Sequence, residues 1–181
     1  MKQQPSQTEL AAAVRNAVRD IADFPKPGIL FRDITPLLAN SELFRSVTSY
    51  LGALSSNEAI THVIGIESRG FIFGAPVAQV LGAAFVPVRK PGKLPAKVIR
   101  EEYALEYGVD ALEMHSDALG FASRVLIIDD VLATGGTAAA TCRLVERAGG
   151  TVAGCSFLME LAALGGRARL DGRNVKTIIA Y

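Results

Sequence analysis

The chain has 181 residues, of which 50% are hydrophobic and 20% are charged. This length suits one domain (1–181) with a full core, and the composition excludes a disordered chain. A net charge of +1 gives no bulk attraction for nucleic acid, and no apolar run reaches the length of a membrane span. We therefore expect neither nucleic-acid nor membrane partners. Cys142 and Cys155 each lie in an apolar stretch, so we expect buried free thiols and a cytoplasmic protein.

The N-terminal third of the chain predicts two helices separated by a break. Ser6 and Glu9 have the spacing of a capping box. The apolar residues that follow at helical spacing predict a helix to about residue 21; they are Leu10, Val14, Val18 and Ile21. The proline-rich stretch 24–28 must end this helix, and Asn40 or Ser41 can cap a second one.

Further along, short apolar strands alternate with helices. Strands are predicted at 62–66, 84–88, 125–128, 152–158 and 175–180, and helices at 70–81 and 138–148. This alternation indicates an α/β fold with a mostly parallel central sheet flanked by helices. The charged stretch 89–115 fits no element, and loops of this length are usually functional or disordered.

The segment 125–137 carries the strongest functional signal. Asp129 and Asp130 follow a strand that is apolar on both faces, and a turn rich in threonine and glycine (134–137) leads into a helix. Glycines let backbone N–H groups approach a phosphate at a helix start, hydroxyls add donors, and the acids can accept hydrogen bonds from a sugar diol. No lysine completes a Walker A loop, and a dinucleotide fingerprint needs a third glycine. The alternative is an ordinary turn with a solvated acidic edge.

A second loop follows the strand 62–66. Glu67, Ser68, Arg69 and Gly70 place a hydroxyl and a guanidinium at a helix start, which suits a diphosphate, although a capped helix with a surface arginine is the simpler alternative. Past the strand 84–88 lies a basic cluster that could meet the same anion; it consists of Arg89, Lys90 and Lys93. Any single lysine there could equally belong to a solvated loop.

The segment around the acid pair resembles the 5-phosphoribosyl-1-pyrophosphate (PRPP) motif of type I phosphoribosyltransferases. The matching residues are Asp129, Asp130, Ala133, Thr134, Gly135, Gly136 and Thr137. The resemblance implies that the acids hold the ribose hydroxyls and that the loop holds the 5′-phosphate. It also implies that the loop 67–70, with Arg89 and Lys93, binds pyrophosphate and that the Glu67–Ser68 peptide is cis.

Two further segments resemble the hood of those phosphoribosyltransferases that act on adenine. They are 24–34, and 89–95 together with 105–108, within hood regions of about 24–36 and 90–115. The resemblance implies that Phe31 stacks on the base, although core packing is the plainer alternative. It further implies that the backbone at Leu30 and Arg32 reads the base edge. Glu106 would face N7 of the base, and Tyr107 would help to close a flexible loop.

The activity implied by this resemblance is the transfer of a phosphoribosyl group from PRPP to adenine, giving AMP and pyrophosphate. Arg69, Glu106, Asp129 and Asp130 would carry catalysis, with Mg²⁺ carried by PRPP near the two aspartates and no direct metal site in the protein. The family also implies a homodimer. Two alternatives stay open: a phosphoribosyltransferase for another base, such as hypoxanthine, guanine, xanthine or orotate, and a PRPP-sensing regulator without catalytic activity.

Overall fold

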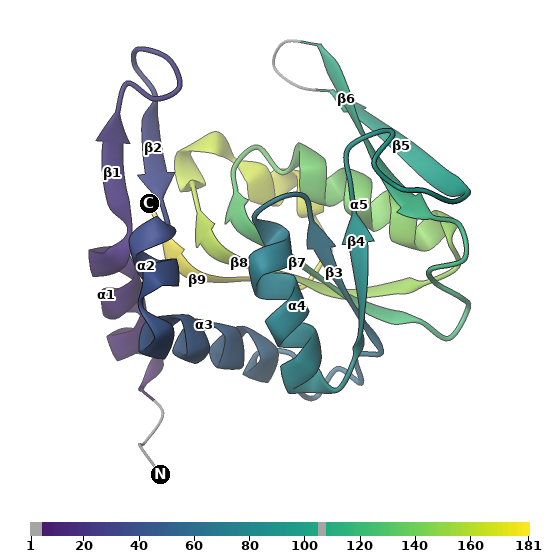
Figure 1. Ribbon diagram of the computed structural model, residues 1–181, viewed down its shortest axis with the longest axis horizontal. Helices are drawn as coiled ribbons and strands as arrows, with labels where there is room; N and C mark the ends of the chain where they lie inside the picture. The colour runs from purple at the N-terminus through teal and green to yellow at the C-terminus, as the bar shows by residue number, and fades with distance from the viewer. Residues whose placement is uncertain (1–4, 105–107) are drawn as a thin grey trace.

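A five-stranded sheet forms the centre of the computed structural model, which describes residues 5–104 and 108–181 (Figure 1). The strand order is β4-β3-β7-β8-β9, and every neighbouring pair is parallel. The strands are β3 (His62–Ile66), β4 (Ala84–Val88), β7 (Arg124–Leu132), β8 (Thr151–Glu160) and β9 (Val175–Ala180). The predicted α/β fold with a parallel sheet is therefore confirmed.

The apolar runs locate all five strands, but two strands are longer than predicted. β3, β4 and β9 have the expected bounds, whereas β8 continues to Glu160. The prediction that β7 ends at Ile128 was wrong: the strand runs on through Asp129 and Asp130 to Leu132. It continues because β8 keeps pairing alongside it, with Asp129 opposite Phe157 and Leu132 opposite Glu160.

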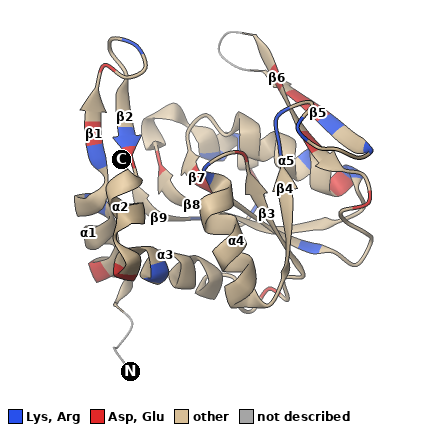
Figure 2. Ribbon diagram, in the orientation of Figure 1, with Lys and Arg blue, Asp and Glu red and all other residues tan. Residues whose placement is uncertain are grey.

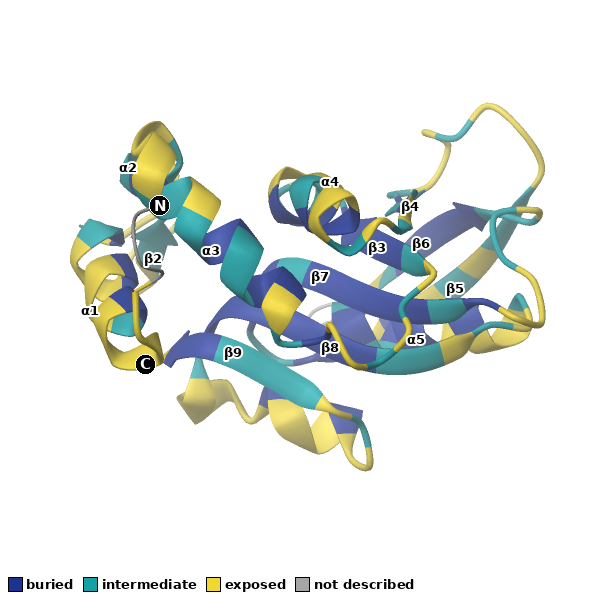
Figure 3. Cartoon of the chain, turned by 90° about the horizontal axis from the view of Figure 1, so that it is seen from below, coloured by how far each residue is buried: buried dark blue, intermediate teal, exposed yellow. Residues whose placement is uncertain are grey.

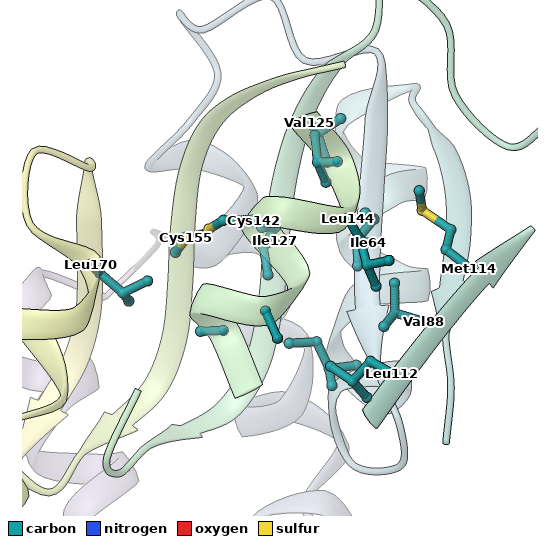
Figure 4. Packing of buried hydrophobic residues seen from close by; sticks show 14 of the residues in the cluster. Ile64, Val88, Leu112, Met114, Val125, Ile127, Cys142, Leu144, Cys155 and Leu170 are labelled. Atoms are coloured by element: carbon teal, nitrogen blue, oxygen red, sulfur yellow. Dashed lines mark hydrogen bonds between the residues drawn. The ribbon is translucent and has the colours of Figure 1, made fainter. Parts of the chain in front are cut away.

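Both faces of the sheet are covered, which explains why its strands are apolar without alternation. The helices α1 (Gln7–Ala17), α3 (Ser41–Ala53) and α4 (Gly70–Leu81) cover one face, and α5 (Gly136–Arg147) lies on the other (Figure 3). Successive residues of β7 serve the two faces in turn: Leu126 and Ile128 lie in the core on the α4 side. Val125 and Ile127 lie in the core on the α5 side (Figure 4).

The helix caps follow the prediction, but the first helix ends early. Ser6 and Glu9 form the expected capping box, and the Asn40 side chain accepts a hydrogen bond from the N–H of Leu43 at the start of α3. The helix α1 ends at Ala17 and not near residue 21, because the chain becomes extended at Val18. The strand β1 (Arg19–Ala22) then pairs antiparallel with β2 (Leu30–Asp33), and a short helix α2 (Thr35–Ala39) follows.

The stretch 89–115 contains a hairpin that the sequence analysis missed. The strand β5 (Val98–Ala104) pairs antiparallel with β6 (Val109–His115) over seven residue pairs. Leu112 and Met114 of β6 are buried against the α5 face of the sheet (Figure 4). Glu101 joins this hairpin to α5 through ion pairs with Arg143 at 2.5 Å and Arg147 at 2.8 Å.

The order of the strands creates a switch point between β3 and β7. The chain leaves β3 through α4 to β4 on one side, whereas β7 leads through α5 to β8 on the other. Ligands of open parallel sheets bind beyond the carboxyl ends of the strands at such a point. Both hairpins project from this end of the molecule (Figure 1).

The two thiols are free and buried, as predicted. Cys142 on α5 and Cys155 on β8 lie with their sulfur atoms 3.8 Å apart. Two short 3₁₀ turns, η1 (Ala162–Leu164) and η2 (Gly166–Leu170), connect β8 to β9. Within the described ranges, no helix has the length and apolar character that crossing a membrane would require.

Candidate active site at the carboxyl edge of the sheet

A cavity of about 300 Å³ opens at the switch point. Its wall comes from the loop after β3, the segment after β4, the end of β7 with the turn that follows it, the start of α5 and one residue of β8. The lining residues are Glu67, Ser68, Arg69, Lys90, Asp129, Asp130, Val131, Leu132, Ala133, Thr134, Gly135, Thr137, Ala138 and Phe157. The two loops that the sequence analysis singled out therefore meet in one cavity.

The turn after β7 leaves the backbone N–H groups at the start of α5 accessible to an anion, and this depends on the conformation of Gly135. Gly135 is the N-cap residue of α5 and has a φ of 78°, a left-handed conformation that glycine adopts without strain. A side chain at this position would collide with the backbone carbonyl of Gly166 in η2. The first backbone N–H groups of α5 lack partners one turn back, so this helix start offers donors and a partial positive charge to a phosphate.

The acid pair lies between this turn and the loop after β3. Asp130 is only 3% exposed, and its backbone N–H donates to Oδ1 of Asp129 at 2.9 Å. Arg69 Nε lies 3.0 Å from Asp130 Oδ2, yet the pair lacks hydrogen-bond geometry: the oxygen is buried and accepts no hydrogen bond from the described residues. Such an unsatisfied oxygen is costly in a folded protein, and a ligand hydroxyl would satisfy it.

The environment of the two carboxyl groups favours their neutral forms. Burial, and next the neighbouring charge of Asp130, raise the pKa of Asp129 well above its ordinary value. Burial also raises the pKa of Asp130, although the guanidinium of Arg69 opposes this effect. The chain thus holds two acids with raised pKa values next to one another, an arrangement common at functional sites.

The peptide Glu67–Ser68 is cis, as the resemblance implied. The carboxylate of Glu67 is the centre of a cationic cluster: it accepts from Lys93 Nζ at 2.7 Å, from the Arg89 side chain at 3.2 and 3.3 Å, and from the Lys90 N–H at 2.9 Å. Partial burial alone would raise the pKa of Glu67, but these hydrogen bonds outweigh it and lower the pKa to about 2. Glu67 is therefore ionised and holds the loop after β3 against the segment after β4.

The structure places the predicted basic residues differently from one another. Arg89 and Lys93 bind Glu67 and do not line the cavity, whereas Lys90 does. Side chains alternate along an extended segment, and Val86 and Val88 already point to the α5 face. Lys90 lies two residues after Val88, so its side chain points to the same face as Val88, and this alternation could have singled it out from Arg89.

The expected base-binding residues lie on β2, close to the cavity. The ring of Phe31 packs edge-to-face on Phe24 with centroids 5.1 Å apart, and the Arg69 guanidinium carbon lies 5.2 Å from the Phe31 centroid. Leu30 is 48% exposed. Arg32 forms an ion pair with Asp20 on β1, and its guanidinium carbon lies 3.8 Å from the centroid of the Tyr181 ring.

Not every predicted site residue can be placed. Gly70 begins α4 directly behind the loop 67–69, and Gly136 begins α5, so both lie next to the cavity wall without lining it. Glu106 and Tyr107 lie outside the described residues. The apolar part of the wall was not predicted; it is formed by Val131, Leu132 and Phe157. Phe157 reads as ordinary strand, and Val131 and Leu132 lie beyond the predicted end of β7 at Ile128.

Comparisons with known proteins agree on a single family. The phosphoribosyl transferase domain family matches residues 33–179. An adenine phosphoribosyltransferase of Acaryochloris marina is 54% identical over 168 residues, which are 93% of this chain and 99% of the relative.

Solved structures give the same answer. The adenine phosphoribosyltransferase of Rhodothermus marinus matches with a TM-score of 0.92 and 52% identity, covering 96% of this chain and 99% of that one. The Saccharomyces cerevisiae enzyme, solved with an imino-altritol bisphosphate and adenine, matches with a TM-score of 0.89 and 39% identity, covering 94% and 99%. Fold, loops and similarity together show that this chain belongs to the adenine phosphoribosyltransferases, within the phosphoribosyl transferase domain family.

Proposed function

We propose that this protein transfers the 5-phosphoribosyl group of PRPP to adenine, giving AMP and pyrophosphate, with the cavity at the switch point as its active site. One observation carries the assignment of the site. A buried carboxylate with an unsatisfied oxygen, Asp130 Oδ2, lies in the same cavity as the open helix start at Gly135. A sugar phosphate needs both: acceptors for its hydroxyls and donors for its phosphate.

The sugar phosphate binds along the end of β7 and the start of α5. Asp129 and Asp130 accept hydrogen bonds from the ribose 2′- and 3′-hydroxyls, which satisfies the buried oxygen. The 5′-phosphate binds the turn 133–137, where the backbone N–H groups and the hydroxyls of Thr134 and Thr137 donate to it. The same two carboxylates also stabilise positive charge that grows on the ribose ring as the bond to pyrophosphate breaks.

Pyrophosphate binds across the loop 67–70, with Arg69 and Lys90 as the cations that line the cavity. Arg89 and Lys93 form ion pairs with Glu67 outside the cavity lining, and they add positive charge near the pyrophosphate. The acid pair, with its unsatisfied oxygen, suits a divalent ion, but the described residues contain no group of three potential ligands. Mg²⁺ carried by PRPP would be held near Asp129 and Asp130, where it would neutralise charge on the leaving diphosphate.

Adenine binds between the hood at β2 and the cavity. Phe31 offers a ring face for stacking, and the backbone at Leu30 and Arg32 offers donors and acceptors to the base edge. The roles that the resemblance implies for Glu106, at N7 of the base, and for Tyr107, in closing the site, fall outside the described residues. The yeast relative was solved with adenine bound, which supports a base site in this fold.

The reaction needs alignment and electrostatics more than covalent help. N9 of adenine displaces pyrophosphate at C1 of the ribose with inversion, through a transition state of oxocarbenium character. The chain holds nucleophile and leaving group in line and neutralises the charge that develops on the leaving group. Product release then contributes to the turnover rate.

We propose that the protein acts in the cytoplasm, in keeping with its free thiols, and that it forms the homodimer that the resemblance implies. A single assay tests the function: the chain, Mg²⁺ and PRPP are mixed with adenine, hypoxanthine, guanine, xanthine or orotate in turn, and nucleotide is measured. We expect AMP from adenine at the highest kcat/KM. Faster turnover of another base would contradict the adenine assignment, and PRPP binding without turnover of any base would indicate a sensor.

A further inference from the structure

A polar cluster joins two residues of the hairpin β5–β6 to Lys90 at the cavity wall. The Lys90 ammonium donates to the Tyr103 hydroxyl at 2.9 Å and forms an ion pair with Asp110 Oδ2, and the same hydroxyl donates to Asp110 Oδ2 at 3.0 Å. Lys90 is the only one of the three that lines the cavity. Acidic and basic residues gather where this hairpin meets the segment after β4 (Figure 2).

The register of the hairpin places Tyr103 and Asp110 so that both contact the Lys90 ammonium. Tyr103 on β5 lies directly opposite Asp110 on β6. Residues opposite one another in an antiparallel pair project from the same face, so both side chains can reach the same ammonium. The ring of Tyr103 is itself buried, at 6% exposure, against the start of α5 beside Gly136.

The backbone of Lys90 is fixed from two sides. Its own N–H donates to Glu67, and the neighbouring Arg89 exchanges backbone hydrogen bonds of 2.9 and 2.7 Å with Glu113 on β6. A lysine normally loses side-chain freedom at some cost when it binds an anion, because its four-carbon stem is flexible. In this structure the bonds of the Lys90 ammonium to Tyr103 and Asp110 already restrict the side chain before any ligand binds.

We propose that Tyr103 and Asp110 are positioning residues that hold the Lys90 ammonium at the cavity for the pyrophosphate group of PRPP. This inference rests on the proposed function. Neither residue belongs to the PRPP motif or the pyrophosphate loop, and although both lie in the hood region 90–115, the resemblance gives neither of them a role. They act through Lys90, the member of the cluster that lines the cavity.

The ionisation of the cluster agrees with this role. Partial burial would raise the pKa of Asp110, but hydrogen bonds from Lys90, Ala111 and Tyr103 outweigh it and lower the pKa. Burial would likewise lower the pKa of Lys90, yet its bonds to Asp110 and Tyr103 raise it. The ammonium is thus kept charged in a partly buried place.

The test compares Asp110→Asn, Tyr103→Phe and Lys90→Met with the wild type, in steady-state kinetics and in calorimetric binding of PRPP and of pyrophosphate. We expect Asp110→Asn to raise the KM for PRPP and the Kd for pyrophosphate about tenfold, and Tyr103→Phe about threefold, because a charged hydrogen-bond network is lost. The KM for adenine should change less than twofold. Glu102→Gln is the matched control, since Glu102 is another ion-paired acid of the same hairpin, bound to Arg100 at 3.1 Å but exposed.

A double mutant separates positioning from plain structural support. If Asp110 acts through Lys90, adding Asp110→Asn to Lys90→Met changes the KM for PRPP no further. Asp110→Glu should recover part of the loss. An unchanged or lowered KM for PRPP in Asp110→Asn, equal losses for adenine and PRPP, or multiplicative effects in the double mutant would overturn the inference. A wild type without turnover would instead overturn the proposed function.

Discussion

The cavity wall from β7 to α5 and the two hairpins that flank it are built on different principles. The wall consists of buried strand and helix, whereas the hairpins are held by cross-strand pairing and ion pairs. In the hairpins, β1, β2 and β5 are exposed or half-buried over most of their length, while the middle of β6 is buried (Figure 3). We therefore expect wall substitutions to lower PRPP use, and to cost stability where they add a side chain, and we expect hairpin substitutions to act on one substrate or on attachment alone.

The largest effect is expected for Gly135→Ala. The new methyl group would be strained at a φ of 78° and would collide with Gly166, so we expect a stability loss of about 1–3 kcal/mol and a kcat/KM for PRPP lowered more than a hundredfold. Thermal unfolding and steady-state kinetics measure both. Gly172→Ala is the matched control, because Gly172 has a φ of 74° but open space around it. Activity retained by Gly135→Ala would contradict the tight fit of the loop.

Asp130→Asn should separate function from stability within the wall. We expect kcat/KM for PRPP to fall by roughly two orders of magnitude, since a charged acceptor for the ribose is lost. The pKa of Asp130 is raised on folding, so its ionised form destabilises the fold at pH values above its ordinary 3.8, and the neutral amide removes that penalty.

The melting temperature of Asp130→Asn at pH 7 should therefore equal or exceed that of the wild type, and the difference should shrink towards pH 4. Calorimetry over this pH range checks the sign. The exposed acid Asp117 supplies the control Asp117→Asn, for which neither quantity should move. A variant that melts earlier but keeps its PRPP kinetics would refute the assignment of Asp130.

In the N-terminal hairpin, Phe31→Leu should affect one substrate only. We expect the KM for adenine to rise about tenfold, the size of a lost stacking interaction, and the KM for PRPP to stay within twofold. Initial-rate measurements with each substrate varied separately give both constants. Phe121→Leu, at a ring that is 97% exposed, is the control. Equal changes in the two constants would assign Phe31 to packing.

The smallest effect is expected for Glu101→Gln on the second hairpin. The variant loses the ion pairs with Arg143 and Arg147 that join the hairpin to α5, and a stability loss of about 1 kcal/mol or less is expected at low salt. The loss should shrink at 1 M NaCl, because salt screens partly exposed pairs. Chemical denaturation at both salt concentrations measures it, and a loss that is independent of salt would argue against an electrostatic attachment.

The same contrast decides what could be predicted from the sequence. The strand at Val125–Ile128 is readable because four apolar residues in a row suit burial on both faces, and Ser6 and Asn40 mark helix starts by local chemistry. The two hairpins cannot be predicted in this way, because each strand is defined by its pairing with another segment of the chain. Ile21 continues the helical spacing of Leu10, yet it faces Phe31 across a strand pair, a partner that no local pattern shows.

The candidate site could be predicted where its residues are concentrated in one segment. The acid pair and the turn 133–137 lie next to one another in the chain, so their types and spacing suffice. Lys90 was harder to separate from Arg89, since only the parity of strand β4 assigns them to different faces. The cluster of Lys90 with Tyr103 and Asp110 depends on the register of a hairpin, and such a register cannot be read without knowing that the hairpin exists.

The contact between Gly135 and Gly166 has a consequence for protein engineering. Two backbones meet here with no side chain between them, one in the turn before α5 and the other in η2. Chimeras assembled from different family members should therefore inherit residues 133–137 and 162–170 from the same parent. A crossover placed between these stretches would pair surfaces that were never selected to fit.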